Sequence, residues 1–474
     1  MAIRTADALQ RLGPVADCLL THDRPIVRPV DDSVVRLGPD GVQVLRRARG
    51  YAPLPLLLKR AMPTILAVGG HLKNTVALAV GGRGPTTPVV LSQHVGDLDN
   101  VPSVDVFRRA IDDLIAFFGA APQRVACDLH PDYASTRRAE QLAADWGVPL
   151  VRVQHHHAHV AACMAEHGIE GPVLGLAWDG TGYGSDGTVW GGEALVCVGG
   201  TFHRAAHLRT FPLPGGDRAA REPRRSALGL LYELLGDEAL DHAKPWFHES
   251  DQKPLLAMLR RGVNSPRTSS MGRLFDAVAM LCGLTPVVSF EGQAAMALEF
   301  AADAGIDEAY EVPLSLRERA GVRGAALDVA ASPPGPTRES LGYNVNSVER
   351  TSDIPASVRT SPHPNPLPEG EGTGLVADWG PLVRAVLADR AAGEPIGRIS
   401  ARFHGALARL AVSIAQSVGC EQVVLSGGCF QNALLTELVH RRLCDAGFSV
   451  FMHRQVPPGD GGIALGQVFV AARQ

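Results

Sequence analysis

The 474-residue sequence has no excess of basic charge, because 45 lysines and arginines stand against 49 aspartates and glutamates, a formal net charge of −4. Proteins that bind nucleic acid mainly through its phosphates carry a basic surface, so we expect no nucleic acid partner. The content of 46 % hydrophobic and 20 % charged residues is that of an ordinary soluble globular protein, long enough for two or three domains.

The sequence also lacks long apolar runs and paired cysteines. No stretch approaches the roughly 20 apolar residues that cross a bilayer, and the first residues, MAIRTADALQRLGP, lack the apolar stretch of a secretory signal. None of the 8 cysteines forms a CxxC pair, so neither a disulfide framework nor a zinc ribbon is predicted. We therefore expect a cytoplasmic protein without a membrane partner, whose cysteines are mostly small core residues.

Two related patterns indicate a duplicated architecture. TILAVGGHLKNTVALAVGG, from Thr64, is an apolar strand, a polar turn with glycine and a second strand. PVLGLAWDGTGYGSDGTVWGGEALVCVGG, from Pro172, repeats that order, and helical sequence follows each pattern. The repetition predicts an α/β fold of two halves with a cleft between them, and two coincidental hairpins are the alternative.

The remaining sequence predicts the division of the chain. Residues 1–57 are too few for a domain of this composition and have the character of the tail of one, while 58–170 and 171–474 form the first and second lobes. IGRISARFHGALARLAVSIA, from Ile396, has the apolar spacing of an amphipathic helix and precedes the strand QVVLSGG. Residues 313–373 are rich in proline, serine, arginine and glycine without apolar periodicity, which predicts a disordered insertion.

The segment VQHHHAHVAA, residues 153–162, contains a candidate metal site. His155 and His159 are separated by one helical turn, so both can bind one ion. Two imidazoles need a further ligand, and Asp179 and Asp460, each in a glycine-flanked turn, are the candidates. A lone histidine pair is more often structural, but four clustered histidines with such acids favour a divalent metal. Iron or zinc suits this set, and magnesium is also compatible with it.

His156, beside the predicted pair, is a candidate acid or base, although a hydrogen-bonded structural histidine is the stronger alternative. Three glycine-rich turns, DGTGYG, SGGCFQN and PPGDGGIALG, would let backbone N–H groups approach a phosphate. A tight turn explains any one of them, whereas three in an α/β protein favour a nucleotide. Cys429 has no neighbouring histidine in the sequence, so a small buried residue is a better interpretation than a nucleophile. The acidic segments GDLDN and DLHPDY are weaker candidates.

Motifs along most of the chain resemble one known family. They are, in order, AVGGHLKNT, LSQHVGDLDN, DLHPDYAST, VQHHHAHVAA, WDGTGYGSDGTVWGGE, LPGGDRAAREPRR, GRLFDAVA, FEGQAAMALE, ARFHGALA, SGGCFQN and GDGGIALGQ. Together they resemble the HypF carbamoyltransferases of NiFe-hydrogenase maturation, with the resemblance interrupted only by the predicted insertion.

The resemblance implies both a reaction and a fold. Members of that family use carbamoyl phosphate and ATP to make carbamoyl-adenylate, then transfer the carbamoyl group to the C-terminal cysteine of a partner, HypE, on the way to the cyanide ligands. Their C-terminal region is similar to the tRNA threonylcarbamoyl transferases. It has the duplicated two-lobed fold of actin, heat-shock ATPases and sugar kinases (ASKHA), with a central nucleotide cleft.

The resemblance also implies roles for individual residues. It implies a metal at His155 and His159 with the acids Asp179 and Asp460, and we take His156 and Asp179 as the predicted catalytic residues. The predicted nucleotide contacts are Gly427, Gly428 and Asn432 in SGGCFQN, Asp276 at the ribose, and Lys73 at a phosphate. A solvated turn lysine is the alternative for Lys73.

The sequence departs from the family pattern at its beginning. Only THDRPIVRPVDDSVVR and RRARGYAP, within residues 1–57, resemble the end of the YrdC-like domain that makes the adenylate. We therefore expect the transfer half of a split enzyme, supplied by a separate chain with acylphosphatase, zinc-finger and YrdC-like domains. A tRNA threonylcarbamoyl transferase-like enzyme and a non-catalytic remnant of an interrupted gene are the alternatives.

Overall fold

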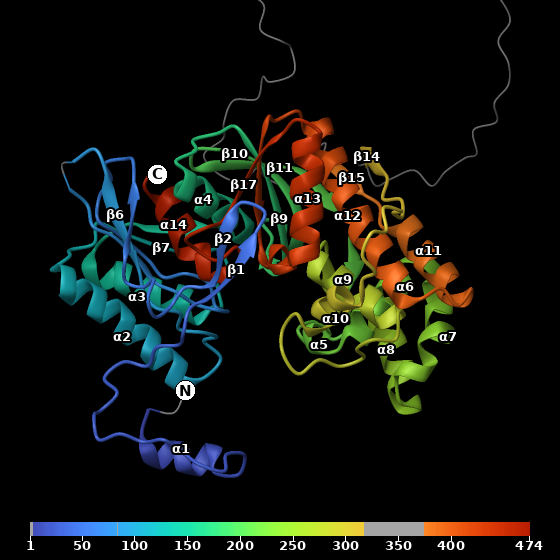
Figure 1. Cartoon of the computed structure of the whole chain (residues 1–474), viewed down its shortest axis with the longest axis horizontal. Coiled ribbons are helices and arrows are strands. Elements are labelled where there is room, and N and C mark those ends of the chain that lie inside the picture. The colour runs from blue at the N-terminus through green and yellow to red at the C-terminus, as the bar shows by residue number, and fades with distance from the viewer. Residues whose placement is uncertain (1–2, 83, 317–373) are drawn as a thin grey trace, which may run out of the picture.

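The computed structural model describes residues 3–82, 84–316 and 374–474 (Figure 1). Most of the predicted insertion, residues 317–373, lies outside the described residues. Its predicted start at Pro313 is corrected by the structure. Leu314–Leu316 form strand β14, which pairs antiparallel with β15 (Leu375–Ala377) because their backbone groups complete the edge of a sheet.

The first lobe is built on a six-stranded sheet with the order β3-β6-β5-β4-β7-β8. The bounds are β3 (Pro55–Leu58), β4 (Ile65–Ala67), β5 (Ala77–Ala79), β6 (Thr87–Leu91), β7 (Arg124–Asp128) and β8 (Leu150–Val153). The predicted hairpin is confirmed, because β4 and β5 pair antiparallel. Helices α2 (Val101–Phe118) and α3 (Ala134–Trp146) bury their apolar faces against this sheet.

The second lobe is built on a nine-stranded sheet with the main order β14-β15-β11-β10-β9-β16-β17. The bounds are β9 (Val173–Tyr183), β10 (Val189–Val198), β11 (Thr201–Leu208), β12 (Phe211–Pro212), β13 (Arg267–Thr268), β16 (Gln422–Ser426) and β17 (Ser449–Met452). The second predicted hairpin is confirmed by the antiparallel pairing of β9 with β10.

Helices of the second lobe include α12 (Ile396–Val418), which confirms the predicted amphipathic helix and ends at Gly419 in a left-handed conformation. The others that pack around it are α9 (Met271–Leu281), α10 (Gln293–Ala301), α11 (Gly380–Ala391) and α13 (Ala433–Asp445). Four helices extend the lobe further: α5 (Arg218–Arg221), α6 (Pro223–Leu235), α7 (Ala239–Ala243) and α8 (Glu249–Arg261).

The two sheets repeat one topology, which confirms the predicted duplication. In the first, β4, β5 and β6 form an antiparallel meander, and β7 and β8 then add parallel to β4 on its other side. In the second, β9, β10 and β11 form the meander, and β16 and β17 add parallel to β9. Both lobes therefore have the strand order 3-2-1-4-5, the duplicated two-lobed α/β fold expected from the sequence.

Helices α4 (His155–His167) and α14 (Ile463–Ala471) lie side by side between the two sheets (Figure 1). Their backbones are very close, since a Cβ at Gly466 would lie 1.9 Å from the carbonyl oxygen of Ala158. The surrounding core contains residues of both sheets. Although α14 lies in the predicted range of the second lobe, 171–474, it packs against β4 and β7 of the first sheet.

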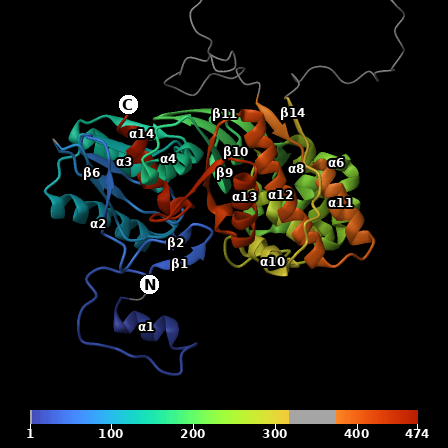
Figure 2. The same ribbon diagram turned by 45° about the horizontal axis from the view of Figure 1, so that its top comes forward.

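The N-terminal segment contains helix α1 (Thr5–Leu12), which buries no residue and lies at the margin of the molecule (Figure 2), and the hairpin of β1 (Val34–Gly38) and β2 (Gly41–Arg46). This hairpin contacts the second lobe, where the Arg36 guanidinium donates to the carbonyl oxygens of Gln431 (2.5 Å) and Phe430 (3.1 Å). Among the described helices, none has both the length and the apolar character that a bilayer span requires.

Candidate functional site

Four of the predicted site residues meet between the lobes. His155 and His159 project from α4, Asp179 from β9, and Asp460 from the short 3-10 turn (Asp460–Gly462) that leads into α14. One ligand atom from each lies within 4.8 Å of the other three. The helical spacing of the histidines and the convergence of β9 and α14 on α4 therefore assemble the arrangement that the sequence predicted.

The separations between these atoms suit a bound ion. His155 Nε2 lies 3.3 Å from Asp179 Oδ2 and 3.8 Å from Asp460 Oδ1, and His159 Nε2 lies 3.4 and 3.6 Å from the same two oxygens. A tetrahedron with metal–ligand bonds of about 2.1 Å has edges of about 3.4 Å. His159 Nε2 is also buried without a well-formed hydrogen bond. The residues present therefore fit a divalent ion.

Asp128, at the end of β7, fixes the orientation of His155. Its Oδ2 lies 2.8 Å from His155 Nδ1, and both side chains are almost completely buried. A proton on Nδ1 donated to this carboxylate leaves the Nε2 lone pair facing the cluster, as in the carboxylate–histidine pairs of many metal proteins. The sequence prediction did not select Asp128 for the site, although DLHPDY was noted as acidic. Its position at the carboxyl end of a buried strand was the available signal.

Burial and the neighbouring carboxylates have opposite effects on the pKa values of His155 and His159. Burial alone would lower the pKa of His155, but Asp128, Asp179 and Asp460 raise it well above its usual range. The pKa of His159 is likewise raised by Asp179 and Asp460 against the effect of burial. For Asp179, burial would raise the pKa, but the two imidazoles hold it well below the ordinary value. The carboxylates of the cluster therefore stabilise positive charge at this site, and a divalent ion would supply that charge.

His156 is completely buried beside the cluster but is not one of the four converging ligands. Gln154 accepts from His157 N with Oε1, so its amide nitrogen donates to Tyr183 O (3.0 Å) and faces His156 Nδ1 (3.2 Å). The proton of His156 is then on Nε2, for which the described part of the chain provides no hydrogen-bond partner. Burial and the neighbouring His155 lower its pKa far below the usual range. The ring is therefore neutral and can act as a hydrogen-bond donor.

The SGGCFQN loop follows β16 and contacts the cluster. Gly428 N donates to Asp179 Oδ1 (2.9 Å), while Gly427 has φ +99° and a Cβ there would lie 2.2 Å from the Trp178 carbonyl oxygen. Only glycine fits at that position. Asn432 is engaged elsewhere, because its Oδ1 caps α13 by accepting from Leu435 N (2.8 Å) and its amide lies 3.0 Å from His404 Nε2. The nucleotide contacts assigned to these three residues stay predictions.

Two further predicted contacts lie on opposite lobes. Lys73, in the β4–β5 turn, pairs through its ammonium group with Glu291 of the second lobe. Burial alone would lower the pKa of Lys73, but Glu291 and Asp460 raise it above its ordinary value. Asp276, on α9, is buried, and burial raises its pKa to about 6 despite the charge of Arg273. The sequence prediction missed Glu291, whose only signal was its place in FEGQAAMALE.

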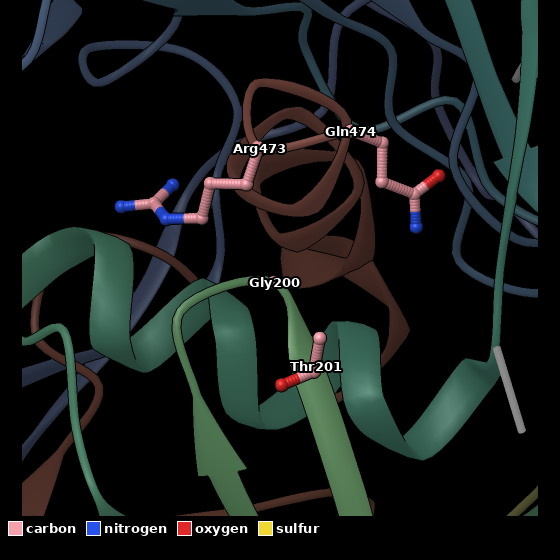
Figure 3. Close-up of a pocket in the computed structure, with 4 residues that line it drawn as sticks. All are labelled: Gly200, Thr201, Arg473 and Gln474. Atoms are coloured by element: carbon pink, nitrogen blue, oxygen red, sulfur yellow. The ribbon is translucent and has the colours of Figure 1, made fainter. Parts of the chain in front are cut away.

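Cys429 and a surface pocket are not part of the cluster of His155, His159, Asp179 and Asp460. Burial, together with the charge of Asp179, raises the pKa of the Cys429 thiol well above its usual range, so the thiol stays protonated, as expected for a residue that is not a nucleophile. A surface pocket is lined by Gly200, Thr201, Arg473 and Gln474 (Figure 3). It lies at the end of α14 opposite Asp460 and contains none of the predicted site residues.

Comparison with family models gives two matches. Residues 60–166 match the HypF Kae1-like domain, and residues 175–332 and 348–467 match the second subdomain of the carbamoyltransferase Kae1-like domain. The second match therefore continues into the predicted insertion at both of its ends.

Curated relatives match almost the whole chain. It is 41 % identical to carbamoyltransferase HypF2 of Cupriavidus necator, over 99 % of this chain and 54 % of the relative. It is 40 % identical to carbamoyltransferase HypF of Synechocystis, over 100 % of this chain and 56 % of the relative. The chain thus spans about half the length of these two relatives. A shorter protein of C. necator, the carbamoyltransferase HypF homolog, is 38 % identical over 86 % of this chain and 92 % of the relative.

Two solved structures share the fold. Full-length HypF in its phosphate- and nucleotide-bound form superposes with a TM-score of 0.81 at 34 % identity, covering 100 % of this chain and 65 % of that one. HypF of T. kodakarensis superposes with a TM-score of 0.78 at 30 % identity, covering 100 % of this chain and 56 % of that one. With both lobes matched by HypF family models and the fold matched throughout its described length, the chain belongs to the HypF carbamoyltransferase family.

Proposed function

We propose that this chain transfers a carbamoyl group from carbamoyl-adenylate to the C-terminal cysteine of a HypE-like protein in the cytoplasm. The observation that carries the proposal is the convergence of His155, His159, Asp179 and Asp460 between the lobes, in contact with the Gly428 turn. Such a site can hold the phosphoryl group of an adenylate between metal ligands and a glycine-rich turn. The intact set of ligands argues against a non-catalytic remnant.

In the proposed reaction, the partner's thiolate attacks the carbamoyl carbon, a carbon–sulfur bond forms, and the carbon–oxygen bond to the phosphate breaks to release AMP. A divalent ion held by His155, His159, Asp179 and Asp460 would neutralise charge on that phosphate. Asp128 keeps His155 oriented, and Asp179 fixes the Gly428 turn. In its Nε2–H tautomer, His156 can donate a hydrogen bond to developing negative charge but cannot accept the thiol proton.

We propose that acylphosphatase, zinc-finger and YrdC-like domains make the carbamoyl-adenylate that this site uses. Both family models matched here are Kae1-like, and the chain spans about half the length of its first two curated relatives, so the proposal assigns only the transfer step to the described lobes. In this arrangement the N-terminal segment 1–57 is the end of a YrdC-like domain.

The test supplies purified chain with carbamoyl-adenylate and the HypE-like protein, and intact-mass spectrometry follows the partner. We expect the mass of one carbamoyl group to be added, and a partner with its C-terminal cysteine changed to serine should gain nothing. No transfer, or transfer to tRNA instead, would contradict the proposed acceptor. If residues 1–474 alone release pyrophosphate from ATP and carbamoyl phosphate, the assignment of only the transfer step to these residues is wrong.

A further inference from the structure

Arg273, in the first turn of α9, lies beside the metal-ligand cluster and has no role in the function proposed above. It is 8 % exposed, and neither its Nε nor its Nη1 has a hydrogen-bond partner among the described residues. Buried guanidinium N–H groups are nearly always paired, because leaving one unpaired forfeits its interaction with water. Two such groups without hydrogen bonds beside the cluster therefore indicate a ligand.

The backbone fixes the base of this side chain against Asp179 and Gly180 of β9. Ser270 caps α9 by accepting from Arg273 N (3.0 Å), and its hydroxyl lies 2.6 Å from Gly180 O and 3.1 Å from Asp179 O. A Cβ on Gly272 would lie 2.8 Å from Gly180 Cα. The start of α9 is thus in contact with the residue that follows a metal ligand.

The guanidinium lies between the glycine-rich end of β9 and the SGGCFQN loop. Its Nη2 is the atom nearest to a Cβ built on Gly180, at 3.4 Å, and its charge acts on Cys429 in the SGGCFQN loop. Gly428 of that same loop donates to Asp179. Arg273 therefore lies where the DGTGYG segment of β9 and the SGGCFQN loop meet.

The ion pair of Arg273 with Asp276 leaves hydrogen-bonding atoms of both side chains without a hydrogen bond among the described residues. Nη1 lies 3.0 Å from Asp276 Oδ2, one helical turn away, but without hydrogen-bond alignment, and that oxygen also lacks a partner. A purely structural buried ion pair is stabilising only when hydrogen bonds satisfy the remaining donors and acceptors. Both members of this pair thus retain bonding capacity for a third group.

We propose that Arg273 binds the phosphoryl group of the nucleotide ligand, donating to its oxygens from the first turn of α9. A planar guanidinium with free donors matches a phosphate better than a carbonyl or hydroxyl ligand, because it can bind two oxygens of one phosphoryl group. The inference rests on the proposed function for the identity of the ligand, an adenylate. Arg273 would be a phosphate-binding residue, and the predicted ribose contact, Asp276, would act beside it.

The experiment measures the affinities of the full chain for AMP and for adenosine by titration calorimetry. We expect Arg273→Gln to weaken AMP binding by about tenfold or more and adenosine binding by less than about twofold, as for loss of a charge-assisted bond to phosphate. Arg273→Lys, which keeps the charge, should recover part of the AMP affinity. Asp276→Asn should weaken both ligands alike if Asp276 contacts the ribose.

Arg209→Gln is the matched control, since Arg209 is an arginine of the same lobe that pairs with Glu233 and Asp378. Adenosine binding reports whether each variant is folded. Equal losses for AMP and adenosine in both Arg273 variants, no loss for either, or a wild-type chain that does not distinguish the two ligands would overturn the inference. Carbamoyl transfer is assayed separately, so failure of the transfer reaction with intact AMP discrimination would affect only the proposed function.

Discussion

At the scale of single residues, the site depends on which imidazole nitrogen carries a proton. The contact between Asp128 and His155 Nδ1 determines this for one ligand, and the Gln154 amide determines it for His156. Asp128 lies in another segment of the chain, and Gln154, although it lies within VQHHHAHVAA, is not a metal-ligating residue type. The sequence therefore predicted the four residues that converge but not the groups that orient the imidazoles.

Asp128→Asn tests the orienting role of this carboxylate. An amide can still contact His155 Nδ1 but does not hold its proton as a carboxylate does, so we expect metal affinity to fall by about 10- to 100-fold. Competition with a chromogenic chelator measures the affinity. Asp132→Asn, which changes an exposed acid of the same segment paired with Arg137, is the control. Equal affinities of wild type and Asp128→Asn would contradict the role.

His155→Ala combined with His159→Ala tests the site itself. Removing both nitrogens leaves two carboxylates, which hold a divalent ion weakly, so the purified variant should lose its bound metal and its nucleotide affinity. Elemental analysis and calorimetry check the two outcomes. His157→Ala is the control, since His157 is buried on the same helix but is not part of the cluster. Unchanged metal content in the double variant would place the ion elsewhere.

Glu166 predicts a pH dependence of stability away from the site. Burial raises its pKa to about 7, although the N–H groups of Arg454 and Gln455 hydrogen-bond to it. Its Oε2 accepts no hydrogen bond from the described residues and lies 3.7 Å from His453 Nδ1. The pKa of Glu166 in the folded chain exceeds its value in the unfolded chain. Between these two pKa values, Glu166 is therefore protonated in the folded chain and ionised in the unfolded chain. Stability therefore falls as pH rises from about 4.5 to about 7 and is then constant.

Glu166→Gln removes that titration while keeping an oxygen that can accept from the same N–H groups. We expect the variant to gain about 1–3 kcal/mol over wild type at pH 8 and little at pH 5. Urea unfolding at both pH values measures the difference. A gain that is the same at pH 5 and pH 8 would show that the carboxyl group does not titrate in this window.

At the scale of elements, the hairpins, α12 and the duplicated strand order followed from apolar periodicity and turn residues, which are local properties. The pairing of Lys73 with Glu291 and the packing of α9 on Asp179 and Gly180 of β9 did not, because they join segments far apart in the sequence. The strand β14 was also missed, since three residues at the margin of a proline-rich tract carry too little pattern. Contacts set by tertiary packing override such weak local signals.

Gly466→Ala tests the crossing of α4 and α14. The added methyl group would lie 1.9 Å from the Ala158 carbonyl oxygen, so the helices must separate, and we expect a loss of about 1–3 kcal/mol or more. Because Asp460 immediately precedes α14, metal binding should weaken as well. Gly82→Ala, at a glycine with open space around its Cβ, is the control for thermal unfolding and metal content. A stable variant with full metal content would mean that the crossing tolerates the change.

At the scale of the whole molecule, the β14–β15 pair makes a deletion testable. Leu316 pairs with Leu375 across this antiparallel ladder, so a short turn can join the two strands. Replacing residues 317–373 with a four-residue glycine-rich turn should leave the urea midpoint and metal content unchanged. Loss of either property would show that the replaced segment contributes to the folded protein.

The position of α14 at the end of the sequence determines when the first lobe can finish folding during synthesis. Residues 55–153 supply the strands of the first sheet early in synthesis, yet α14, which packs against that sheet, is made only after the second lobe. The inner face of the first sheet thus stays uncovered while about 300 further residues are added, so its folding cannot be completed vectorially. Nascent chains that stop before Ile463 should consequently depend on chaperones and be cleaved within the first lobe.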